Sequence, residues 1–256
     1  MIDSRTATVL GAMAEAGVKC LLTGGQACVI YGGAEFSKDV DFNVLADGEN
    51  FERLQKVAAA LEAEPIAVPP FEKRFLDEGL AIHLRCGLPA VSGFRVDLMS
   101  RMRGVAPFPE LWARRTTVDI GPLEINLMSV RDLVQSKKTQ RSKDWPMIQR
   151  LLEVHYLQRR SGSPDPRDVQ LWLTEMLTPE LVIEVAQLHE KVARSLELER
   201  PLLKPALIGD IELLRSMLTE EIEAEKAADR RYWEPLKARL GDLRRASRGD
   251  NSHPVA

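Results

Sequence analysis

The feature that most constrains this fold is a change of pattern near residue 128. Before it, short runs of aliphatic and β-branched residues alternate with segments of helical periodicity, and after it almost every segment has helical periodicity. The first half predicts an α/β domain over 1–128, and the second predicts a helical domain over 129–250. With 256 residues the chain is long enough for both.

The first half predicts an alternation of strands and helices. A hairpin is expected where two strands are joined by a Gly/Pro/Ser connection, and a last extended piece is interrupted by Gly121-Pro122. We therefore expect a mixed sheet with flanking helices, followed by a helical C-terminal region. The expected helices are 8–16, 26–31 and 50–62, and the expected strands are 18–23, 39–45, 79–86, 94–99 and 118–127.

The second half opens at Ser129, whose side chain can cap the helix that follows. Pro and Gly over 159–166 forbid a continuous helix and predict a linker there, and a loose tail is expected over 251–254. Helices are predicted over 143–159, 166–177, 179–197 and 210–245.

Composition excludes several classes of protein. The chain is 45% hydrophobic and 29% charged, with a formal net charge of -3, so it is neither a disordered chain nor globally basic. Any nucleic-acid role must be local. The three cysteines, Cys20, Cys28 and Cys86, lie among apolar neighbours without a C-x-x-C pair, so reduced core thiols are expected and zinc is not. No apolar run suits a membrane span and the start lacks a leader pattern, which predicts a cytoplasmic protein with no membrane partner.

The pair Asp39 and Asp41 is the most informative candidate site. Residues two apart on a strand share a face, so both carboxylates project together while Val40 and Phe42 turn to the core. Two such carboxylates repel unless a cation neutralises them or one is protonated, which favours Mg²⁺. The alternative is a solvated strand face with two exposed acids.

Asp97 is the candidate third acid. It stands between Val96 and Leu98, so a strand there buries those two side chains and turns Asp97 to the other face. If this strand lies beside the first, three carboxylates converge, as phosphoryl and nucleotidyl transfer requires. The alternative is an acid in a turn or in a salt bridge with Arg95.

Gly24 and Gly25 separate a buried strand from a helix. A double glycine lets backbone approach a ligand, and helical N–H groups can bind the oxygens of a triphosphate. The alternative is a tight turn without a ligand. Neither a P-loop nor a G-x-G-x-x-G motif occurs at this turn.

These elements, taken in order, resemble the signature of the nucleotidyltransferase superfamily, specifically its minimal, AbiEii-like branch. Gly24-Gly25 matches the two small residues that open a helix, Asp39-x-Asp41 the metal-binding pair and Asp97 the third acid. The similarity spans about 15–155. The resemblance implies a Mg²⁺- or Mn²⁺-dependent enzyme of the toxin-antitoxin or defence type, with an NTP substrate, an RNA or protein acceptor and a cognate antitoxin or toxin partner.

The resemblance also implies residues that bind the nucleotide. In this branch a Lys on the helix after the sheet, here Lys137, and a downstream R-x-K-D segment, here beginning at Arg141, close over the nucleotide, and Ser37 and Lys38 flank the acid pair. One position departs from the pattern: Glu35 stands where an Arg is common, so Lys38, Lys137 or Arg141 must substitute or turnover is poor. For Lys137 the alternative is an ordinary solvated helix face.

Two basic stretches, 131–150 and 230–245, are candidate RNA contacts. For the second, an amphipathic helix that packs its aliphatic residues inward is favoured over base stacking. The sequence thus predicts transfer of a nucleoside monophosphate from NTP to an acceptor hydroxyl. A catalytically weak module that binds a nucleotide or a partner, and an interaction protein acting through its helices, are the alternatives.

Overall fold

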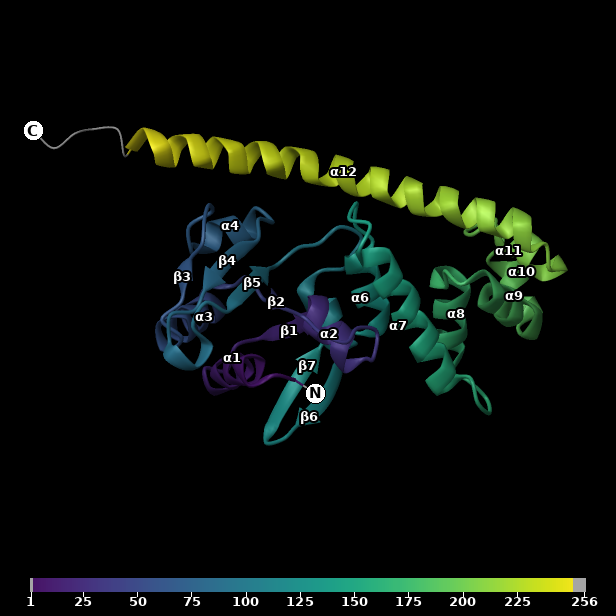
Figure 1. The fold of residues 1–256 in the computed structure, drawn as a ribbon, viewed down its shortest axis with the longest axis horizontal. Helices are drawn as coiled ribbons and strands as arrows, with labels where there is room; N and C mark the ends of the chain where they lie inside the picture. The colour runs from purple at the N-terminus through teal and green to yellow at the C-terminus, as the bar shows by residue number, and fades with distance from the viewer. Residues whose placement is uncertain (1, 251–256) are drawn as a thin grey trace, which may run out of the picture. The chain divides into compact units, whose positions relative to one another are not determined.

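The computed structural model describes residues 2–250. The chain divides into two compact units. Within the described residues, the first comprises 2–30, 36–136 and 231–250, and the second comprises 31–35 and 137–230. Figure 1 labels the elements of each unit along the chain.

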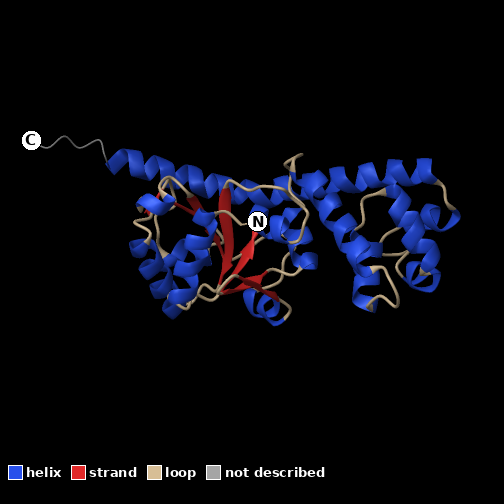
Figure 2. Ribbon diagram, turned by 60° about the horizontal axis from the view of Figure 1, so that its bottom comes forward, coloured by secondary structure: helices blue, strands red, loops and turns tan. Residues whose placement is uncertain are grey.

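The first unit is built on a seven-stranded mixed sheet, in the order β3-β4-β5-β2-β1-β7-β6. The pairs β2–β5 and β1–β7 are parallel, and the other neighbours are antiparallel. The predicted mixed sheet with flanking helices and a helical C-terminal region is confirmed (Figure 2). The strands are β1 (Cys20–Thr23), β2 (Asp39–Val44), β3 (Glu64–Pro65), β4 (Ile82–Arg85), β5 (Arg95–Met99), β6 (Thr116–Ile120) and β7 (Leu123–Leu127).

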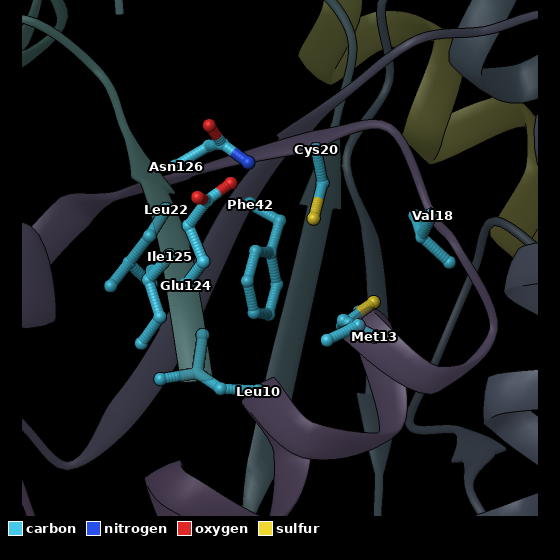
Figure 3. A pocket seen from close by; sticks show the side chains of 10 residues that line it. Leu10, Met13, Val18, Cys20, Leu22, Phe42, Glu124, Ile125 and Asn126 are labelled. Atoms are coloured by element: carbon cyan, nitrogen blue, oxygen red, sulfur yellow. The ribbon is translucent and has the colours of Figure 1, made fainter. Parts of the chain in front are cut away.

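One face of this sheet carries the core. Val40, Phe42 and Val44 alternate along β2 and are buried, and Leu10 and Met13 of α1 line a cavity against Phe42 (Figure 3). That cavity is only about 50 Å³, too small for a nucleotide. The helices of this unit are α1 (Ser4–Glu15), α2 (Gly24–Ile30), α3 (Gly48–Ala60), α4 (Lys73–Asp77), the 3₁₀ turn η1 (Pro89–Val91), α5 (Phe108–Ala113), α6 (Val130–Lys137, whose last residue belongs to the second unit) and the part of α12 (Ile211–Asp250) from residue 231 on.

Side-chain caps fix where two of these helices begin. Asp47 accepts a hydrogen bond from the backbone N–H of Asn50 and starts α3, and Ser129 accepts one from the backbone N–H of Asp132 at the start of α6, as predicted. Asn50 then donates from its side chain to the backbone oxygens of Lys19 and Leu45, which ties α3 to the ends of β1 and β2.

The second unit is helical throughout its longer segment. The single helix predicted over 179–197 is wrong, because the chain leaves helical geometry at His189 and continues as two helices. In the first unit, the single extended piece predicted over 118–127 is instead the hairpin of β6 and β7, which turns at Gly121-Pro122. The helices of the second unit are α7 (Asp144–Arg159), α8 (Pro166–Glu175), α9 (Pro179–Leu188), α10 (Glu190–Ser195), α11 (Leu203–Ile208) and the part of α12 (Ile211–Asp250) up to residue 230.

Two further expectations concern the chain as a whole. Within residues 2–250, none of the helices combines the length and the apolar character that crossing a bilayer requires. The tail predicted over 251–254 lies outside the described residues.

Candidate functional site

Strand β2 presents two carboxylates on the face of the sheet opposite its core. Asp39 and Asp41 are half-buried, whereas Val40 and Phe42 between and beside them are 0% and 1% exposed. The alternation along β2 therefore follows the predicted pattern. The two acids are not a fully solvated strand face, because the sheet partly shields both.

Strand β5 brings the third acid to the same place. It lies parallel to β2, with Asp41 in register with Asp97 and Asp39 in register with Arg95. Register partners on adjacent strands share a face and stand about 5 Å apart. The two acid-bearing strands therefore lie side by side, which is the condition under which the three carboxylates are expected to converge. Asp39, Asp41 and Asp97 form one group, named here the acid face.

Asp97 is held by two neighbours on this face. Arg95 donates from Nε to Asp97 Oδ1 at 2.6 Å and from Nη2 to Oδ2 at 2.8 Å. His83 Nδ1 on β4 lies 2.9 Å from the same Oδ1. Burial raises the pKa of Asp97, but the hydrogen bonds of His83 and Arg95 outweigh it and hold that pKa below its usual value. Asp97 is therefore an ionised, weakly basic carboxylate.

Arg95 faces all three acids. Its hydrogen bond to Asp97 raises the pKa of its guanidinium, burial opposes this, and the charges of Asp97, Asp39 and Asp41 raise it further. The Arg95 guanidinium thus faces three carboxylates, whose mutual repulsion a further cation would reduce.

Gly24 and Gly25 lie directly against this group. A side chain at Gly24 would place Cβ 1.8 Å from Asp41 Oδ2, and at Gly25 it would place Cβ 2.3 Å from Ser37 Oγ. Gly24 also has φ +66°, which other residues rarely adopt. Only glycine lets the start of α2 approach β2 this closely. The predicted contact of their backbone with phosphate stays a prediction.

Ser37 and Lys38 precede β2 and differ in exposure. The Ser37 hydroxyl is buried and lies 3.1 Å from both the backbone oxygen and Oδ1 of Asp39, so it orients that carboxylate. Gln26 donates to the Ser37 carbonyl at 3.3 Å and to Thr6 Oγ1 at 3.0 Å, which fixes the segment before β2 against α2. The Lys38 side chain is exposed.

The remaining predicted residues belong to the second unit. Lys137 is only 9% exposed, so the alternative of a solvated helix face is wrong for it. Arg141 donates from Nε to Asp144 Oδ2 at 2.9 Å, within the predicted R-x-K-D segment. Glu35, the residue that departs from the family pattern, forms an ion pair with Arg150 at 3.2 Å. Their roles toward a nucleotide stay predictions.

The donor chemistry of the acid face fits Mg²⁺ at two of its three acids. Mg²⁺ takes hard oxygen ligands and is commonly held by one or two carboxylates together with substrate phosphates. Asp39 and Asp41 supply such a pair, whereas both oxygens of Asp97 already accept hydrogen bonds from Arg95. Across residues 2–250, no three His, Cys, Asp or Glu side chains stand ready as a metal site.

Three residues of this face escaped the sequence reasoning. His83 reaches Asp97 only because β4 pairs with β5 in the register His83↔Asp97. The sequence indicates Arg95 only as a salt-bridge partner of Asp97 in the alternative interpretation, and the structure contains that salt bridge. Asn43 follows Asp39 and Asp41 on the same face of β2. It is 1% exposed, and neither atom of its amide has a hydrogen-bond partner among the described residues.

No protein family and no curated protein matches this chain. Among solved structures, it is similar to the crystal structure of an antigenic nucleotidyltransferase-like protein from Paracoccidioides brasiliensis. The two are 17% identical, with a TM-score of 0.42, over 79% of this chain and 91% of the other. Function must therefore be argued from the residues of the acid face.

Proposed function

We propose that the protein is a nucleotidyltransferase that moves a nucleoside monophosphate from an NTP to an acceptor hydroxyl of RNA or protein. The observation that carries this proposal is the acid face, where Asp39, Asp41 and Asp97 meet on two adjacent parallel strands beside Gly24. Three carboxylates with one guanidinium are costly for folding alone, and such arrangements cluster at functional sites.

The reaction sets the roles of the chain's residues. The acceptor oxygen forms a bond to the α-phosphorus, the bond from that phosphorus to the bridging oxygen breaks, and pyrophosphate leaves with the electron pair. Asp39 and Asp41 would hold Mg²⁺ or Mn²⁺, which when bound neutralises phosphate charge and polarises the phosphoryl oxygens. Ser37 keeps the Asp39 carboxylate in place through its hydroxyl.

The proton of the acceptor hydroxyl needs a base. Asp97 stands in register with Asp41, but its lowered pKa makes it a weak base. Asp97 therefore takes up the acceptor proton less readily than a free carboxylate does. That Lys137 and Arg141 bind the triphosphate, and that the helical domain covers the site, are parts of this proposal that rest on the family resemblance.

The test is label transfer. Purified protein is incubated with each α-labelled NTP, Mg²⁺ or Mn²⁺, and total RNA or cell lysate as acceptor. We expect label on RNA or protein with the wild type, and a loss of more than about 100-fold in Asp39→Asn and Asp41→Asn, since each removes a charge that holds the cation. Asp119→Asn, an exposed strand acid on β6, is the matched control and should transfer normally. Equal transfer by all four proteins would overturn the proposal.

The second candidate is a module that binds a nucleotide or a partner without catalysis. The observation in its favour is the engagement of Asp97 by Arg95 and His83, which already compensate the charge of the third acid of the predicted metal site. It predicts that NTP with Mg²⁺ raises the melting temperature in an Asp39-dependent way while no label moves. The proposed toxin-antitoxin context rests only on the family resemblance, and co-purification of a partner from the native host tests it.

A further inference from the structure

Arg95 contacts both Asp97 and His83 on the acid face. It lies between β4 and β2 in the sheet, in register with Asp39 on one side and with Arg85 on the other. Its guanidinium bonds both oxygens of Asp97, and its Nη2 lies 3.0 Å from His83 Nδ1. The Arg95 side chain therefore contacts Asp97 and His83 and lies in the electric field of the two acids of β2.

The two partners differ in their freedom to move. The Asp97 side chain is 8% exposed, whereas that of Arg95 is 44% exposed. Asp97 is fixed in the strand and needs a cation, because a buried carboxylate without a partner is costly. Arg95 is long, partly in water and able to leave, and its planar fork binds a carboxylate or a phosphate equally well.

The charge of Arg95 affects the binding of a free cation and of a cation–polyphosphate complex in opposite directions. A divalent cation arriving alone at Asp39 and Asp41 meets the positive charge of Arg95 and finds Asp97 occupied. A cation arriving with a polyphosphate brings an anion to which Arg95 can turn. The same guanidinium therefore opposes the free cation and favours the cation–polyphosphate complex.

We propose that Arg95 is a built-in counter-ion that withholds Asp97 from free divalent cations and couples cation binding to polyphosphate binding. This inference rests on the proposed function, since it assumes a cation at Asp39 and Asp41. Arg95 is a positioning residue here, and its action is measured by binding without turnover.

The first experiment measures Mn²⁺ binding from the loss of the free Mn²⁺ signal in electron paramagnetic resonance. Without phosphate, we expect Arg95→Met to bind Mn²⁺ about 5- to 10-fold more tightly than the wild type, because one nearby positive charge is gone. Arg85→Met is the matched control, since that arginine lies one strand farther from the β2 acids, and it should change the affinity less than about 2-fold.

The second experiment repeats the titration with inorganic tripolyphosphate, in a chelation-corrected series without protein as reference. We expect tripolyphosphate to tighten Mn²⁺ binding by the wild type and to do so at least about 5-fold less in Arg95→Met, because coupling between two ligands is reciprocal. Arg95→Lys keeps the charge but loses the fork, so it should keep the weak binding of free Mn²⁺ and lose part of the coupling.

The outcomes separate the two proposals. If the wild type binds Mn²⁺ in an Asp39-dependent way and Arg95→Met matches it in both titrations, the counter-ion role is wrong and the proposed function stands. If neither the wild type nor Arg95→Met binds Mn²⁺ under either condition, both are wrong. Circular dichroism melts show whether each variant is folded. If Arg95→Met is not folded, the titrations of Arg95→Lys test the counter-ion role.

Discussion

Two charged sites of this protein, one in each unit, are built in different ways. In the second unit, Arg200 is 4% exposed, donates to the backbone oxygens of Leu173 and Met176 at 3.0 and 2.8 Å, and bonds both carboxylate oxygens of Glu221. Four of the five N–H donors of that guanidinium thus have an acceptor. In the first unit, by contrast, three carboxylates stand together on the acid face, where Arg95 and His83 contact Asp97.

The difference is between charged groups that stabilise the fold and charged groups that can bind a ligand. A network such as that of Arg200 satisfies most of its donors and acceptors internally, and removing the arginine leaves buried groups unpaired. The acid face keeps an excess of negative charge within reach of solvent, which contributes little to folding and can attract a cation.

Arg200→Met should have the largest effect on stability. The substitution leaves Glu221 and the carbonyls of Leu173 and Met176 without their donor, so we expect a loss of about 3–5 kcal/mol in the free energy of unfolding. Urea denaturation followed by circular dichroism measures it. Arg215→Met is the matched control, because that arginine is half exposed and its ion pairs are worth less than about 1 kcal/mol. Equal losses in the two variants would show that the Arg200 network is not closed in solution.

Gly24→Ala should have the next largest effect. The added methyl carbon would stand 1.8 Å from Asp41 Oδ2 at a backbone φ of +66°, so a steric clash adds to conformational strain. We expect a loss of about 3 kcal/mol in the free energy of unfolding. Gly93→Ala is the matched control, since Gly93 has φ +75° with nothing within 4 Å of the added carbon, and it should lose only about 1 kcal/mol. A loss no larger in Gly24→Ala would mean that α2 does not lie against Asp41.

Local pattern in the sequence accounts for much of the acid face. Alternation of Val40 and Phe42 around Asp41, and of Val96 and Leu98 around Asp97, fixes which way each side chain points once the segments are strands. The pairing of the two strands is a condition of the shared site, and only the structure supplies it. The family resemblance added the roles but no contact.

Other parts of the structure depend on register and on contacts that local pattern does not encode. His83 meets Asp97 only through the pairing of β4 with β5, and Gly24 is required by a carboxylate seventeen residues away. The helices α4 and α11 have five and six residues, too few for periodicity to be seen. Asn43 gives no sign in the sequence that its amide is buried without a partner among the described residues.

Replacing His155 of the second unit should change the free energy of unfolding by a smaller amount, which depends on pH. Burial lowers the pKa of His155, Arg159 adds to this and Asp168 opposes it, while Trp172 donates to its Nδ1 at 3.0 Å. The unfolded chain then binds the proton more readily than the folded one. The contribution of His155 is therefore fully present above the unfolded pKa of about 6.5 and is lost as the pH falls through that value.

The urea midpoint of wild type and His155→Gln, measured from pH 8 to pH 5, isolates this contribution. The glutamine amide can still accept from Trp172 but does not titrate. We expect the stability difference between the two proteins to shrink as the pH falls, and a difference that grows toward pH 5 would mean that Asp168 dominates and that the folded protein keeps His155 charged.

Asp39→Asn should have the smallest effect on stability and is the sharpest test of the contrast. Asp39 is half-buried, and an asparagine Oδ1 can still accept the hydrogen bond from Ser37, so we expect a change within about 0.5 kcal/mol by urea denaturation. The same variant should lose Mn²⁺ binding and label transfer, because it removes one of the two charges that hold the cation. A loss of stability as large as that of Arg200→Met would instead place Asp39 in a closed structural network. The excess charge of the acid face would then be part of the folding energy, and it would no longer argue for a ligand.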